Sequence, residues 1–134
     1  MGGFLAYDGA LAAGGPPDRW SDLGLDDAVG HLRAFDDGDW ARLVERLPAA
    51  PAAWRARCAQ TLSEADPDHA LPLLLTLLQD EDPDVTEAAA DSLASLAQDG
   101  ATPTLDEVSR AALARLVARG GLAAGPAQRL LAHP

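Results

Sequence analysis

Residues 71–93 read LPLLLTLLQDEDPDVTEAAADSL, and this stretch decides the fold of the 134-residue chain. Leucines recur at helical spacing before the acidic turn, and small and apolar residues recur at helical spacing after it. Asp82 can cap the free amides of a helix that begins at Pro83, because the missing N–H of proline costs nothing at a first helical position. The stretch therefore predicts two helices, at 70–79 and 83–97, joined by a short turn.

The apolar pattern of this stretch recurs 31 residues earlier in the chain. Sliding the sequence by that distance superposes Leu43 on Leu74, Val44 on Leu75, Leu47 on Leu78, Trp54 on Val85, Cys58 on Ala89, Ala59 on Ala90 and Leu62 on Leu93. A weaker third copy contains Leu113, Leu116, Val117, Leu122, Leu130 and Leu131. Because each helix pair has an apolar face that it cannot bury alone, we expect neighbouring pairs to stack into one core.

The stretch 71–93 resembles a HEAT repeat, since its Asp-Pro-Asp-Val turn is followed by small alanines. The resemblance implies a helical solenoid that presents its second helices on a concave binding surface, and it implies no particular activity. HEAT repeats often carry a basic residue after the valine of this turn, whereas this chain has Thr86 and Glu87 there. By that comparison, the usual charge of the inner face is reversed in this chain.

Helical periodicity extends over most of the remaining chain. The predicted helices span 26–35, 39–48, 52–65, 70–79, 83–97, 105–119 and 125–132. Gly100 and Gly120 supply flexible stops after two of them. The sequence therefore predicts an all-α fold, a short HEAT-like α-solenoid of about three antiparallel helix pairs, over residues 26–134.

Two helix starts need separate treatment. Thr104 and Glu107 have the Ser/Thr-x-x-Glu spacing of a capping box, which predicts that a helix begins between them. Pro72 leaves two alternatives, because proline is disfavoured inside a helix. Either the helix begins just before it, near Leu71, or a helix that begins near Pro67 is kinked at Pro72.

Residues 1–25 are rich in glycine and proline, yet they contain the large apolar side chains of Phe4, Leu5, Tyr7, Leu11 and Trp20. Pure linkers do not usually contain so many large apolar groups. We predict an irregular N-terminal arm that, with the helix at 26–35, covers one end of the helical body. The alternative is that the arm forms part of a binding surface.

Residue usage excludes several classes of function. All ten basic residues are arginine, so enzymes that depend on a lysine nucleophile or a phosphate-loop lysine are excluded. The single cysteine, Cys58, cannot form an intramolecular disulfide, which favours a reducing, cytoplasmic location. The start of the chain has no basic region and its apolar residues are interrupted by Asp8, so we expect no signal peptide. No apolar run reaches the roughly 20 residues that span a bilayer, so we expect no membrane association.

Charge is segregated along the chain, whose formal net charge is −11. Residues 1–57 hold nine acids and six arginines, residues 58–109 hold twelve acids and no base, and residues 110–134 hold four arginines and no acid. The acidic middle section repels phosphate, which argues against nucleic-acid binding and favours a basic protein partner. The alternative is that the negative charge serves solubility alone.

Six acids near the turn are candidates for binding such a partner: Asp80, Glu81, Asp82, Asp84, Glu87 and Asp91. The last three are spaced at i, i+3 and i+7, which places them along one stripe of the helix at 83–97, with no arginine close by in sequence. Calcium binding is disfavoured, because an EF-hand loop needs glycine at its sixth position and glutamate at its twelfth, where this chain has Val85 and Asp91. We expect no metal and no cofactor. A plain solvated helix face is the alternative for the stripe.

Two further candidates for partner binding are Arg55 and Trp40. Arg55 and Arg57 lie on the equivalent helix one repeat earlier, where they can meet partner carboxylates or cover neighbouring apolar surface. Trp40 stands in the first turn of its helix, where we expect a half-exposed aromatic anchor. Trp54 aligns with Val85 and is predicted to be core.

No catalytic residues are predicted. His31, His69 and His133 are far apart and show no ligand spacing, and Cys58 aligns with Ala89 as a small buried residue. We therefore predict a non-catalytic protein–protein interaction module whose acidic surface docks a basic protein, for example a toxin-neutralising immunity protein or an assembly adaptor. The alternative is a small HEAT-like enzyme such as a tetrapyrrole lyase or chaperone-lyase, which would need a pocket with convergent polar groups. A pocket containing His69 or Cys58 would favour this alternative.

Overall fold

The computed structural model describes residues 3–12 and 24–132, and over these ranges every regular element is a helix and there are no strands. The elements are α1 (Phe4–Ala12), α3 (Leu25–Arg33), α4 (Asp37–Arg46), α5 (Ala52–Thr61), α6 (Pro67–Leu77), α7 (Pro83–Gln98), α8 (Glu107–Arg119) and α9 (Ala124–Ala132). Single 3-10 turns, Leu47–Ala49 and Leu62–Glu64, extend α4 and α5. The predicted all-α class is confirmed.

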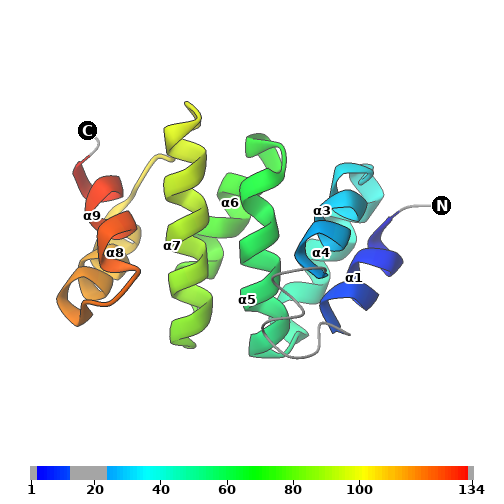
Figure 1. Cartoon of the computed structure of the whole chain (residues 1–134), viewed down its shortest axis with the longest axis horizontal. Helices are drawn as coiled ribbons and strands as arrows, with labels where there is room; N and C mark the ends of the chain where they lie inside the picture. The colour runs from blue at the N-terminus through cyan, green and yellow to red at the C-terminus, as the bar shows by residue number, and fades with distance from the viewer. Residues whose placement is uncertain (1–2, 13–23, 133–134) are drawn as a thin grey trace.

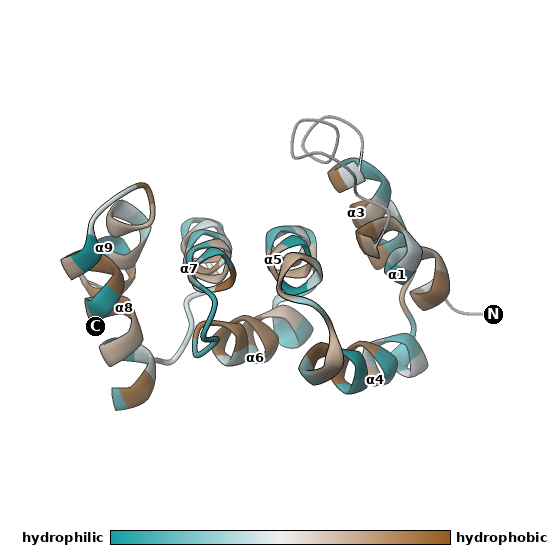
Figure 2. Ribbon diagram, turned by 90° about the horizontal axis from the view of Figure 1, so that it is seen from below, coloured by the Kyte–Doolittle hydropathy of each residue, from teal (hydrophilic) through white to brown (hydrophobic). Residues whose placement is uncertain are grey.

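The helices form two layers along a short solenoid (Figures 1 and 2). The second helices of successive pairs, α5, α7 and α9, pack side by side in one layer, and α3 continues this layer beside α5. The first helices, α4, α6 and α8, form the other layer. The three pairs α4–α5, α6–α7 and α8–α9 are the three predicted ones, and α1 packs against α3 at the N-terminal end.

The core confirms most of the 31-residue repeat. Both members are buried in the superposed pairs Leu43 and Leu74, Leu47 and Leu78, Trp54 and Val85, Cys58 and Ala89, Ala59 and Ala90, and Leu62 and Leu93. Val44 is an exception, because it is exposed on α4. Leu122, expected as part of the third copy's apolar skeleton, is also exposed. Stacked pairs therefore share one continuous core, in which truncating a fully buried leucine to alanine costs about 2–5 kcal/mol.

Several helix ends form as the sequence predicts. The Asp82 side chain accepts a hydrogen bond from the Asp84 N–H at 2.9 Å, and Pro83 occupies the first turn of α7. Gly100 follows α7 with φ +99°, and Gly120 ends α8 with φ +77°. Residues with a side chain rarely adopt a positive φ, so glycine at these two positions allows both helices to end abruptly.

Of two other helix starts, one differs from its prediction and the other distinguishes between two alternatives. The capping box at Thr104 and Glu107 is wrong, because α8 begins at Glu107 and its cap is Asp106, which accepts from the Ser109 N–H at 2.8 Å. For Pro72, the helix start of the second alternative is correct, because α6 begins at Pro67 and continues through Pro72. In the first case, the capping residue is therefore Asp106, two residues closer to the apolar stripe than Thr104.

The prediction of an irregular arm over residues 1–25 is wrong for Phe4–Ala12, which form helix α1. The cap of this helix comes from far away in sequence, because the buried Asp39 carboxylate accepts hydrogen bonds from the Gly3 and Phe4 N–H groups at 3.0 and 3.1 Å. Phe4, Tyr7 and Leu11 are buried, so this part of the arm does cover the end of the core as expected. Trp20 lies outside the described residues.

Candidate functional site

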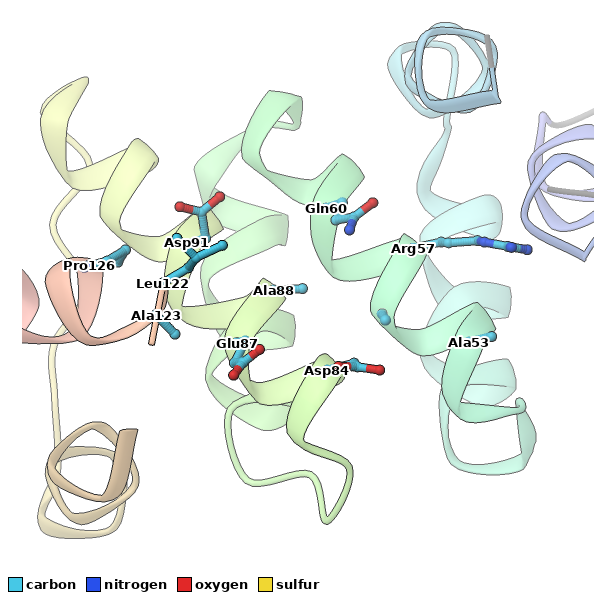
Figure 3. A pocket seen from close by; sticks show the side chains of 11 residues that line it. Ala53, Arg57, Gln60, Asp84, Glu87, Ala88, Asp91, Leu122, Ala123 and Pro126 are labelled. Carbon is cyan, nitrogen blue, oxygen red and sulfur yellow. The ribbon is translucent and has the colours of Figure 1, made fainter. Parts of the chain in front are cut away.

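The layer of second helices, which contains α5, α7 and α9, has a groove with an acidic wall. Asp84, Glu87 and Asp91 line it from α7, together with residues of α5 and of the segment that leads into α9. Figure 3 shows these carboxylates along α7, between Ala53 and Gln60 of α5 on one side and Leu122 and Pro126 on the other. The groove has a volume of about 550 Å³, and its remaining lining residues are Ala56, Arg57, Ala88 and Ala123.

The carboxylates that line the groove differ in their partners. Arg119 of α8 donates from Nη2 to Oε1 of Glu87 at 3.1 Å, so the sequence-based expectation that no arginine offsets the stripe is wrong for Glu87. Within the described residues, Asp84 and Asp91 are exposed and form no ion pair. Arg57 does not neutralise them, because its guanidinium points away in Figure 3 and donates to the Leu11 carbonyl at 2.8 Å. The groove therefore keeps a negative wall.

The acids of the turn before α7 have structural partners instead. Asp80 accepts two hydrogen bonds from Arg55, from Nε at 2.7 Å and from Nη2 at 3.1 Å, in a partly buried ion pair that joins α5 to the α6–α7 turn. Burial raises the pKa of Asp80, but the Arg55 guanidinium and the Asp82 amide outweigh burial and lower this pKa below its ordinary value. The hydrogen bond to Asp80 raises the pKa of Arg55, although burial opposes it.

The six predicted acids therefore form two groups. Asp80 and Asp82 support the turn and the start of α7, and Glu81 is exposed on the same turn. Of these six acids, only Asp84, Glu87 and Asp91 line the groove. Arg55 belongs with the first group, since its guanidinium is held by Asp80 and the Ala50 carbonyl rather than facing the groove.

The prediction that Trp40 is a half-exposed anchor is wrong, because its side chain is only 9% exposed. Its ring stacks on His69 of α6, with centroids 4.6 Å apart and an interplanar angle of 4°, and packs edge-on against Phe35. Trp40 is therefore part of the core. The large apolar residue that does face solvent beside the groove is Leu122, which is 98% exposed. Helical periodicity missed it because it treats every leucine near a helix as core.

The Cys58 thiol and the His69 imidazole lie away from the groove. The thiol of Cys58 is fully buried, and burial raises its pKa to about 12 although the nearby Tyr7 hydroxyl lowers it, so the nucleophilic thiolate does not form at neutral pH. Neither Cys58 nor His69 lines the groove. Across residues 3–12 and 24–132, no three His, Cys, Asp or Glu side chains cluster as a metal site. None of the helices in these ranges is long and apolar enough to cross a membrane.

Stacked helix pairs whose second helices line a groove define the class of α-solenoid repeat proteins. A family model of HEAT repeats matches residues 40–124, and the chain belongs to this family. Comparisons with curated proteins and with solved structures gave no significant match. HEAT repeats generally mediate protein binding, so membership of the family indicates a protein-interaction scaffold.

Proposed function

We propose that the chain is a non-catalytic interaction module that docks a basic protein partner in the groove between α5, α7 and the start of α9. The observation that carries this proposal is the acidic wall of the groove. Asp84 and Asp91 are exposed there without an ion pair among the described residues, and the groove lining also includes small alanines, which let a partner approach closely. A cationic segment complements such a wall in charge.

Long-range charge supports the same partner. The chain carries a net charge of −11, and twelve of its acids lie in residues 58–109, which include α7. A field of one sign accelerates the encounter with a basic protein and repels nucleic-acid phosphate. A toxin neutralised by the chain and a component recruited by an adaptor are the two versions of this proposal, and both place the single free thiol, Cys58, in a reducing cytoplasm.

A pocket containing His69 or Cys58 would favour the tetrapyrrole-lyase alternative. Cys58 lies in the core and His69 stacks on Trp40, so neither side chain reaches the groove. Within the described residues, the groove therefore lacks the two groups that would favour a lyase, and the interaction module is the function that the groove supports better.

The test is a capture experiment with the whole chain as bait, in native-host extract at about 0.05 and 0.5 M salt. Because screening shortens the reach of charge, the partner should be retained at low salt and lost at high salt. A bait with Asp84→Asn and Asp91→Asn should lose it at low salt too. The matched bait carries Glu45→Gln and Asp99→Asn, which remove the same charge from exposed positions outside the groove.

A partner held equally at both salt concentrations contradicts the electrostatic mechanism. A partner lost equally from the two double variants contradicts docking in the groove, because net charge alone would explain both losses. Mass spectrometry of the captured protein then distinguishes a toxin from an assembly component.

A further inference from the structure

Glu87, the middle carboxylate of the groove wall, already holds a guanidinium. Arg119 reaches it from the last turn of α8, and the two side chains remain 48% and 39% exposed, respectively. Resting on the proposed function, we infer that the groove takes an arginine-bearing amphipathic segment of its partner, and that Arg119 occupies the position on Glu87 that a partner arginine takes over.

The exposure of this ion pair makes the exchange feasible. Surface ion pairs contribute little to folding, because water and salt screen them and both side chains must be ordered. Arg119 therefore acts as a weak internal competitor rather than as a fixed structural link. A guanidinium matches a carboxylate with two parallel N–H groups, whereas an ammonium is a point charge, so the site should prefer arginine to lysine.

The spacing of the carboxylates sets the length of the occupant. Asp84 and Asp91 lie seven residues apart on α7, which corresponds to about 10 Å along the helix axis. Two or three cationic side chains on one face of a short segment can cover this distance. A helical segment with arginines at i, i+3 or i+4, and i+7 reproduces the spacing of the wall.

The other rim of the groove is apolar. Leu122 is almost fully exposed and Pro126 lies close by in Figure 3, while Ala53 and Ala88 leave room for a partner backbone. An amphipathic segment can place its arginines on the α7 wall and an apolar side chain against Leu122. Burying a side chain of this size strengthens binding by about tenfold or more.

The probe for the test is a short synthetic fluorescent peptide with arginines at i, i+4 and i+7 and one leucine, titrated with the full-length chain by fluorescence anisotropy. Arg119→Gln should bind it about two- to fivefold more tightly than the wild type, because Glu87 is released. Arg110→Gln is the matched control, since it removes the same charge from an exposed position of α8 outside the groove. In a Glu87→Gln background, Arg119→Gln should no longer tighten binding.

Equal tightening by Arg119→Gln and Arg110→Gln would overturn the inference, because net charge alone would explain both. Equal affinity for a lysine version of the peptide would overturn the preference for arginine. Leu122→Ser should weaken binding about tenfold, and an unchanged affinity would remove the apolar contact from the inference.

Two outcomes separate this inference from the proposed function. If the wild-type chain binds no peptide even at low salt, the acidic groove is not a docking site and both fail. If the chain itself associates with increasing concentration, and Asp84→Asn with Asp91→Asn abolishes this in light scattering, the occupant is a second copy and the inference is overturned.

Discussion

Two sets of acids that look alike in the sequence have different physical roles. Asp39, Asp80 and Asp82 accept hydrogen bonds from amide groups or from Arg55 inside the fold, whereas Asp84 and Asp91 face the groove without such partners among the described residues. The difference shows that acidic residues in such a run are available to bind a partner only where they form no hydrogen bond or ion pair within the fold. Substitutions in the first set should therefore lower stability, and substitutions in the second should change binding.

The largest effect is expected at Asp39. Its carboxylate accepts hydrogen bonds from three amides, those of Gly3, Phe4 and Asp36, and so joins the start of α1 to the start of α4. Asp39→Ala leaves these buried or half-buried donors without an acceptor and should lower the free energy of unfolding by about 2–4 kcal/mol. Chemical denaturation followed by circular dichroism measures this.

The matched control for Asp39 is Asp37→Ala, two residues earlier in the exposed first turn of α4. It should cost well under half as much, because only a favourable helix-dipole interaction is lost. Equal losses in the two variants would show that Asp39 acts through charge alone and not as a shared cap.

A smaller loss is expected for Arg55→Ala, which breaks the two hydrogen bonds to Asp80. We expect about 1–2 kcal/mol, because the ion pair is only partly buried and water can replace some of the contact. Arg33→Ala removes an exposed pair with Glu64 and should cost less than about 0.5 kcal/mol. Thermal unfolding of both variants checks the order, and the reverse order would contradict the structural role of Arg55.

Lowering the pH should reduce the stabilisation that Asp39 and Asp80 give to the folded chain. The pKa of Asp80 is lowered in the folded chain by Arg55 against the effect of burial, and that of Asp39 by its three amide donors, again against burial. A lowered folded pKa means that the stabilisation is complete above the unfolded pKa of about 3.9 and is lost as pH falls through the folded pKa.

The pH prediction is tested with Asp80→Asn. The difference in Tm between wild type and variant should be largest near neutral pH and should close as pH falls below about 4. A difference that stays constant down to the lowest accessible pH would mean that the ionised carboxylate is not what stabilises the turn.

The sequence predicted the repeat because the apolar spacing that builds each helix pair is local. It did not predict α1, since the Asp39 carboxylate that caps this helix is 35 residues away from Phe4. The stripe of Asp84, Glu87 and Asp91 followed from helical spacing, but their partners did not. Arg119 lies 32 residues from Glu87, and only the packing of the α8–α9 pair against α7 brings them together. Such contacts across repeats decide which charges stay available.

Trp40 shows the same limit for an apolar residue. From its place in the first turn of α4, the sequence predicted that one side of its ring faces solvent. In the structure, His69 of the next repeat covers that side by stacking on the ring. Leu122 is the reverse case, because no neighbouring element covers it. Exposure in a solenoid is therefore decided by the adjacent helix pair, which a single-repeat pattern does not contain.

The smallest effect on stability is expected at Asp91, and its sign is informative. Glu87 and Asp91 are like charges at i and i+4 on α7, an arrangement that destabilises a helix by a few tenths of a kcal/mol. Asp91→Asn should therefore leave the free energy of unfolding unchanged or raise it slightly, while it weakens capture of a basic partner. Urea denaturation and the capture experiment measure the two quantities on one sample. A clear loss of stability would place Asp91 with Asp39 and Asp80, because its charge would then be used by the fold and the groove would lose part of its acidic wall.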